Sequence, residues 1–140
     1  MVNVVGNQIT KLEASKKEVK ERVTELNFNI KTKVDKVEVK RKLENDVSLV
    51  SAKYSLVIDY VFKKKSIANI TFEGEMLFAY SQDAAEKLVK EWKKSKKLER
   101  GMAAAVNKIG FEQCLVEAIN VARMLKLPNP IPIGNLFRKQ

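Results

Sequence analysis

The sequence contains the run Val47-Ser-Leu-Val-Ser-Ala-Lys-Tyr-Ser-Leu-Val-Ile-Asp-Tyr-Val-Phe62, in which apolar and polar side chains alternate. Successive side chains of a β-strand point to opposite faces, so a period of two predicts a strand with one buried face. The face expected to be buried consists of Val50, Ala52, Tyr54, Leu56, Ile58, Tyr60 and Phe62. This run therefore predicts a long strand inside a sheet.

A second run with the same period follows over residues 67–80. Its inward-facing side chains are expected to be Ile70, Phe72, Met76, Phe78 and Tyr80. The link between the two runs is the short polar segment Lys63-Lys-Lys-Ser66. A link this short joins antiparallel strands, because a parallel crossover needs a dozen or more residues. The two runs therefore predict a long antiparallel hairpin at the centre of the sheet.

Upstream of the hairpin, residues 26–34 also alternate, and Val37 and Val39 continue the pattern with the opposite parity. We expect a further strand here, with a bulge or bend at Asp35-Lys36 that re-aims the side chains. Closer to the N-terminus, apolar residues recur at spacings of three, four or seven: Ile9, Leu12, Val19, Val23 and Leu26. This spacing predicts a helix over about residues 10–25 with a lysine-rich outer surface.

Downstream of the hairpin the period changes to that of a helix. Ser81 and Asp83 are N-cap candidates, and the apolar stripe that follows consists of Ala85, Leu88, Val89 and Trp92. A longer helix is expected from about residue 101 to 127, with Gly110 as a weak point and Pro128 as its stop.

Together these segments predict a single α+β domain over residues 1–140. The expected parts are a basic N-terminal helix within 1–25, an antiparallel sheet of three to four strands within 26–80, two covering helices within 81–127, and a proline-containing tail at 128–140.

The composition restricts the chemistry. The chain has no His and one Cys, so it lacks the commonest general base and cannot form a Cys/His zinc site. Cys114 falls on the apolar side of a predicted helix, and the five glycines are too scattered for a phosphate-binding loop. We therefore expect a protein that is not an enzyme, with no catalytic residues, no metal and no cofactor. No signal peptide or membrane span is apparent, so a cytoplasmic location is expected.

Charge indicates the class of partner. Twenty-seven Lys and Arg against 17 Asp and Glu give a formal net charge of +10. The basic residues cluster at expected turns and element ends: Lys16, Lys17 and Lys20; Lys40, Arg41 and Lys42; Lys63, Lys64 and Lys65; Lys93, Lys94, Lys96, Lys97 and Arg100; Arg138 and Lys139. Such clusters can neutralise phosphates without reading bases. They favour binding of structured RNA by a ribosome-associated or ribosomal protein, whose partners would be ribosomal RNA and neighbouring ribosomal proteins.

The order of elements over residues 26–133 resembles the SecB family of export chaperones and its archaeal SecB-like relatives. Leu77-Phe-Ala-Tyr80 is similar to the family's Leu-Phe-Pro-Tyr segment, and Leu127-Pro-Asn-Pro-Ile-Pro132 to its proline-rich stretch. The resemblance implies a four-stranded sheet with two helices on one face, self-association, and grooves that hold non-native polypeptide. SecB proteins are acidic, however, whereas this chain is basic.

This resemblance supplies the alternative hypothesis, a SecB-type holdase that binds unfolded polypeptide. The groove would then be lined by aromatic and aliphatic residues of the strands: Tyr54, Leu56, Tyr60, Phe62, Phe72, Met76 and Phe78. The same side chains are also what a buried sheet face requires. Their burial in a monomer would count against such a groove.

Overall fold

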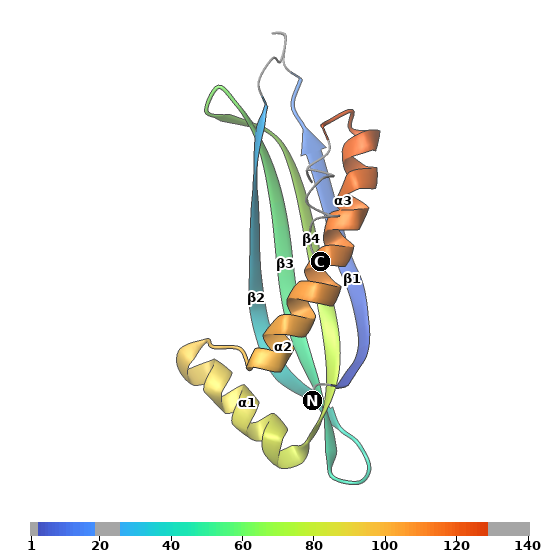
Figure 1. Cartoon of the computed structure of the whole chain (residues 1–140), viewed down its shortest axis with the longest axis vertical. Helices are drawn as coiled ribbons and strands as arrows, with labels where there is room; N and C mark the ends of the chain where they lie inside the picture. The colour runs from blue at the N-terminus through green and yellow to red at the C-terminus, as the bar shows by residue number, and fades with distance from the viewer. Residues whose placement is uncertain (1–2, 19–25, 129–140) are drawn as a thin grey trace, which may run out of the picture.

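The computed structural model describes residues 3–18 and 26–128. Four strands form one antiparallel sheet: β1 (Asn3–Lys16), β2 (Asn27–Lys42), β3 (Val47–Phe62) and β4 (Lys65–Ser81). Their order across the sheet is β1-β4-β3-β2, which places the β3–β4 hairpin at the centre and the first two strands at the edges. The strands run nearly the whole length of an elongated molecule (Figure 1). The predicted central hairpin is therefore confirmed.

The turn of this hairpin consists of Lys63 and Lys64, which have φ angles of 50° and 65°. Two consecutive residues with positive φ form the tight type I′ connection, whose twist matches that of the flanking strands. Glycine or asparagine usually occupies such positions, because a side chain on Cβ crowds the left-handed conformation. The long pairing of β3 with β4 holds the two lysines in this unfavourable conformation.

The predicted N-terminal helix is wrong, because its described part is strand β1, which pairs with β4. The error has a physical cause. The register shifts between Ile9 and Lys11, so that Ile9 lies opposite Gly74 and Leu12 opposite Phe72. A bulge of one residue thus places two apolar side chains three residues apart on the same face of a strand. The remainder of the predicted helix, residues 19–25, lies outside the described residues.

The irregularity predicted in β2 is confirmed. The pairing of β2 with β3 shifts between Val34 and Lys36, so that Val34 lies opposite Tyr54 and Val37 opposite Ala52. Val37 is consequently buried on the same face as the β3 core residues. A second shift follows Val39. The bulge at Asp35 therefore places Val34 and Val37 on the same face of the sheet, although one has an even and the other an odd position in the sequence.

Two helical segments follow the sheet, as predicted. The first, α1 (Gln82–Ser95), begins after Ser81, whose hydroxyl accepts a hydrogen bond from the Ala84 amide at 3.3 Å. The second runs without interruption through α2 (Arg100–Ala105), the π-helical turn η1 (Val106–Phe111) and α3 (Glu112–Met124). This longer helix crosses one face of the sheet diagonally, while α1 lies at one end of it (Figure 1). Among the helices of the described residues, none has the length and apolar character needed to cross a membrane.

The π-helical turn lies above Tyr54, and two glycines make room for this ring. A Cβ atom on Gly110 would lie 2.9 Å from the Tyr54 Cζ atom, and one on Gly74, opposite Tyr54 in β4, would overlap the ring. Phe111 packs edge-on against Tyr54, with ring centroids 5.4 Å apart. The long helix therefore approaches the sheet closely where Tyr54 lies.

Candidate binding surfaces

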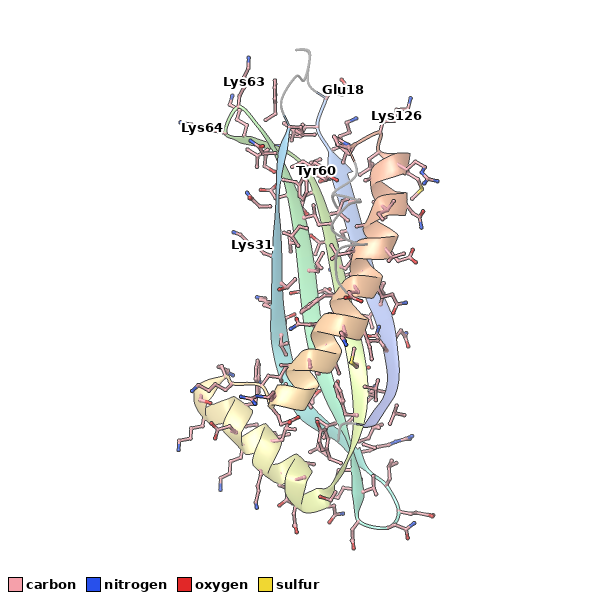
Figure 2. The ribbon with its side chains drawn as sticks, in the orientation of Figure 1. Glu18, Lys31, Tyr60, Lys63, Lys64 and Lys126 are labelled. Atoms are coloured by element: carbon pink, nitrogen blue, oxygen red, sulfur yellow. The ribbon has the colours of Figure 1, made fainter. Side chains whose placement is uncertain are left out.

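The predicted basic clusters lie at two opposite ends of the molecule. Lys63 and Lys64 project from the hairpin end, where Lys126 also lies (Figure 2). Lys16 belongs to this end as well, because its ammonium donates to the Leu125 carbonyl oxygen at 2.8 Å. Lys17, directly after β1, and Lys65, the first residue of β4, neighbour these residues, since the Lys17 amide donates to the Ile67 carbonyl oxygen at 2.7 Å.

The remaining described clusters lie at the other end, which we call the α1 end. The Gln82 amide donates to the Asp46 carbonyl oxygen at 2.8 Å, which joins the β2–β3 turn to the start of α1. This end carries Lys40, Arg41 and Lys42 beside that turn and Lys93, Lys94, Lys96, Lys97 and Arg100 around the end of α1. Strands of this length separate the Lys63–Lys64 turn from the β2–β3 turn by roughly 50 Å, and the end of α1 borders Val34 in the middle of β2. The clusters therefore do not converge on one surface. Lys20, Arg138 and Lys139 lie outside the described residues.

The side chains proposed for a peptide groove are all buried. Tyr54, Leu56, Tyr60, Phe62, Phe72, Met76 and Phe78 are at most 6% exposed. They form the core between the sheet and the helices, together with Met102, Val106 and Cys114. In this conformation a polypeptide cannot reach them, so any polypeptide-binding surface consists of other residues.

A chain of hydrogen bonds links a polar group of this core to the surface. The Tyr54 hydroxyl donates to the Asn7 Oδ1 atom at 2.6 Å, and the Asn7 amide nitrogen donates to the Gln113 Oε1 atom at 2.6 Å. Burial raises the pKa of Tyr54 to about 12. Burial likewise raises the pKa of the Cys114 thiol to about 11, which makes this thiol a weak nucleophile. The network ties β3, β1 and α3 together.

The opposite face of the sheet is covered with ion pairs. Glu75 accepts from the Ser51 hydroxyl at 2.6 Å and lies 3.0 Å from the Lys40 ammonium. The Ser51 hydrogen bond is the main cause that lowers the pKa of Glu75, although partial burial opposes it. Glu73 lies 3.9 Å from the Lys11 ammonium. These carboxylates therefore stabilise a solvated sheet face.

Exposed apolar side chains occur along the flank where α3 approaches β1. Leu12 in β1 faces the helices and is 47% exposed. Val116 is 53% exposed and lies one helical turn beyond Gln113, the residue that contacts β1. Met124, near the end of α3, is 74% exposed. This flank therefore carries three large apolar side chains that are open to water.

A shallow groove lies between β2 and the end of α1, and we call it the Trp92 groove. Its volume is about 450 Å³, and its lining consists of Lys33, Val34, Asp35, Trp92, Lys96 and Leu98. The Lys96 ammonium lies 5.4 Å from the centroid of the Trp92 ring, and the Lys33 ammonium lies 3.3 Å from Asp35. Apolar walls thus stand beneath a rim that carries two lysines and one carboxylate.

The sequence identified Lys96 but missed the groove around it. The sequence pattern predicts Trp92 in the buried stripe of α1 and Val34 on the buried face of β2, and both residues do lie largely inside. A signal was nevertheless available, since the single Trp of the chain is followed directly by five residues of which four are lysines. Amphipathic aromatic residues such as Trp are enriched at surfaces that bind a partner.

A two-layer α+β protein with this strand order and these helices has a SecB-like fold. Among solved structures, the chain is similar to a SecB-like chaperone of Mycobacterium tuberculosis, determined in complex with a ChAD peptide from the HigA1 antitoxin. The likeness covers 91% of this chain and 86% of that one, with a TM-score of 0.61 and 13% sequence identity. No protein-family model matches the sequence, and a comparison with curated proteins gives no match.

Proposed function

We propose that this protein is a polypeptide-binding chaperone that holds non-native chains without catalysing a reaction. The observation that carries the proposal is the SecB-like fold, which extends over 91% of the chain. The structural neighbour is itself a chaperone in complex with a peptide, which supports a polypeptide partner here. A chain without His and with its one Cys buried supports binding rather than catalysis.

The exposed apolar residues of the flank between α3 and β1 supply a contact surface for such clients. Apolar side-chain area is exposed to water at Leu12, Val116 and Met124. Leaving this area in water does not stabilise the folded monomer. An unfolded polypeptide displays apolar side chains that are buried in its own native state. Contact between the two surfaces removes both from water, at about 25 cal/mol per Å² of apolar area.

Binding of structured RNA, the hypothesis that the net charge favours, has less support. The basic clusters do not converge on one surface, and the structural neighbour described above is a chaperone in complex with a peptide. It remains a prediction that sedimentation with ribosomes can test. Six or more phosphate contacts imply about a thousandfold loss of affinity between 50 and 200 mM salt.

The proposed function is tested by diluting a chemically unfolded client protein into buffer and following its aggregation by light scattering. We expect suppression at a near-stoichiometric ratio of chaperone to client, without any nucleotide. A complex of the two proteins should then elute together from a sizing column. Unchanged aggregation at a tenfold excess of this protein would overturn the proposal.

A matched pair of variants links the effect to the flank. Val116→Asp places a charge on the exposed apolar surface, whereas Asn120→Asp adds the same charge one turn further along α3 at a polar exposed position. We expect Val116→Asp to require several times more protein for equal suppression and Asn120→Asp to behave as the unmodified chain. Equal behaviour of the two variants would exclude the flank as the contact surface.

A further inference from the structure

We propose that the Trp92 groove binds acidic segments of non-native polypeptide, with one apolar side chain of the segment inserted between the groove walls. The carboxylates on either side of that side chain would pair with the lysines of the rim. This inference rests on the proposed function and adds to it the class of client that the protein prefers.

The walls of the groove suit an apolar side chain. Trp92 is 7% exposed, and Val34 and Leu98 are half-buried. These three residues come from three segments, namely the edge strand β2, the last turn of α1 and the link to α2. A volume of about 450 Å³ lies at the lower end of the range for ligand pockets. It therefore fits one side chain with adjacent backbone rather than a folded domain.

The charge around the groove selects for acidic flanking residues. Strand β2 carries six cationic side chains and two carboxylates, Asp35 and Glu38. Both carboxylates already lie within ion-pair distance of lysines, at 3.3 Å and 3.1 Å. The last turn of α1 adds Lys93 and Lys94. The excess of cationic side chains gives a positive electrostatic potential, which attracts acidic segments and repels basic ones.

The position of Trp92 favours polypeptide over nucleic acid. Binding of single-stranded nucleic acid uses an open aromatic face on which a base can stack. The Trp92 ring is almost fully buried, and the Lys96 ammonium lies over its face. The groove beside the ring is bordered by the aliphatic side chains of Val34 and Leu98, which suits an apolar side chain rather than a stacked base.

The fluorescence of Trp92 tests the proposal directly, because this is the single Trp of the chain. Three octapeptides are titrated at low salt: a leucine flanked by aspartates, a leucine flanked by lysines, and a serine flanked by aspartates. We expect the first peptide to change the emission of Trp92. The second should bind at least tenfold more weakly because of repulsion, and the third about tenfold more weakly because the buried leucine is lost.

Two variants provide a matched control. Lys96 and Lys64 both have left-handed backbone angles, with φ of 59° and 65°, and asparagine tolerates this conformation. Lys96→Asn and Lys64→Asn therefore change the charge and the backbone preference alike, one at the groove and one at the hairpin end. We expect Lys96→Asn to weaken binding of the acidic peptide two- to fivefold, and Lys64→Asn to leave it unchanged.

The outcomes separate this inference from the proposed function. If none of the peptides alters Trp92 emission while client aggregation is still suppressed, the groove assignment is wrong and the chaperone function stands. If the serine peptide and an RNA oligonucleotide of equal charge bind as tightly as the leucine peptide, the groove serves polyanions and the inference is overturned. If the acidic peptide binds as expected but aggregation is not suppressed, the site is supported as a peptide site and the holdase function fails.

Discussion

At the scale of single residues, Tyr54 determines how closely the long helix approaches the sheet. Its ring is 1% exposed and lies between a strand glycine and a helix glycine, while its hydroxyl reaches the Asn7 side chain. Neither glycine has a positive φ angle, so space and not backbone conformation restricts these positions. Protein interiors are packed as densely as organic crystals, and an added methyl group here has nowhere to go.

Gly74→Ala should therefore destabilise the protein. The new Cβ atom would overlap two ring carbons and the hydroxyl oxygen of Tyr54, whose side chain is fixed in the core, so we expect a loss of about 1 to 3 kcal/mol in the free energy of unfolding by urea. Gly6→Ala is the control, because its Cβ atom would meet no atom within 4 Å. Adding Tyr54→Leu to Gly74→Ala should recover part of the loss. Additive effects of these two substitutions would disprove the steric account.

At the scale of elements, the sequence predicted the parts whose patterns are regular. The alternation of residues 47–62 gave β3 its observed bounds, and Ser81 marks the observed start of α1. The opposed parities of Val34 and Val37 revealed a bulge. A bulge in β1 had the opposite effect, because the extra residue Thr10 gives Ile9 and Leu12 the spacing of a helix. Two apolar residues cannot distinguish a bulged edge strand from a helix, since their pairing partners lie 60 to 65 positions away.

The turn between β3 and β4 gives a prediction of increased stability. Lys64 has a φ of 65°, a conformation that costs a residue with a Cβ atom about 1 kcal/mol. Lys64→Gly removes this cost, partly offset by the greater freedom of glycine in the unfolded chain. We expect the free energy of unfolding, measured by heat or urea, to increase by about 0.5 to 1 kcal/mol. Lys65→Gly, inside β4, is the control and should destabilise the protein. If Lys65→Gly were the more stable of the two variants, the turn conformation would not be the cause.

The start of the long helix depends on one carboxylate. Glu99 accepts hydrogen bonds from the amides of Gly101 at 2.9 Å and Met102 at 3.0 Å. Glu99→Ala leaves both amides without this partner and should lower stability by about 1 kcal/mol. Glu86→Ala, which removes an exposed carboxylate from α1, should change stability by less than half of that amount. Equal losses for both variants, measured by urea unfolding, would rule out the capping role.

At the scale of the whole molecule, net charge indicated an anionic partner but not where that partner would bind. The sequence located every basic cluster at a turn or element end, yet it gave no distance between them, because that distance depends on strand length and register. Nor did it separate the aromatic residues that lie wholly in the core from the one that lines a groove. Tyr54 and Phe72 share the chemistry of Trp92, and only the path of the helices leaves one of the three at a groove.

Acid should destabilise the fold through carboxylates that are hydrogen-bonded in the native state. The Ser51 hydroxyl lowers the pKa of Glu75, and the Gly101 amide lowers that of Glu99, both from an ordinary value of 4.5. The unfolded chain therefore takes up protons first, so this stability is present above about pH 4.5 and is lost as the pH falls through the folded-state pKa values. Glu75→Gln should make the acid side of a pH–stability curve less steep. An unchanged slope would contradict this cause.

Between about pH 6 and 9 stability should be nearly constant, because the chain has no His to titrate there. At higher pH the buried acids act in the opposite direction. Burial raises the pKa of Cys114 from 9.0 to about 11 and that of Tyr60 from 10.0 to about 12, so the unfolded chain loses these protons first. Their contribution is intact below pH 9 and disappears as the pH rises toward 12. Urea unfolding from pH 5 to 11 measures the profile, and Cys114→Ala should delay the alkaline loss. If the urea concentration at the midpoint of unfolding changed markedly between pH 6 and 8, a titrating group other than the carboxylates, Cys114 and Tyr60 would control stability.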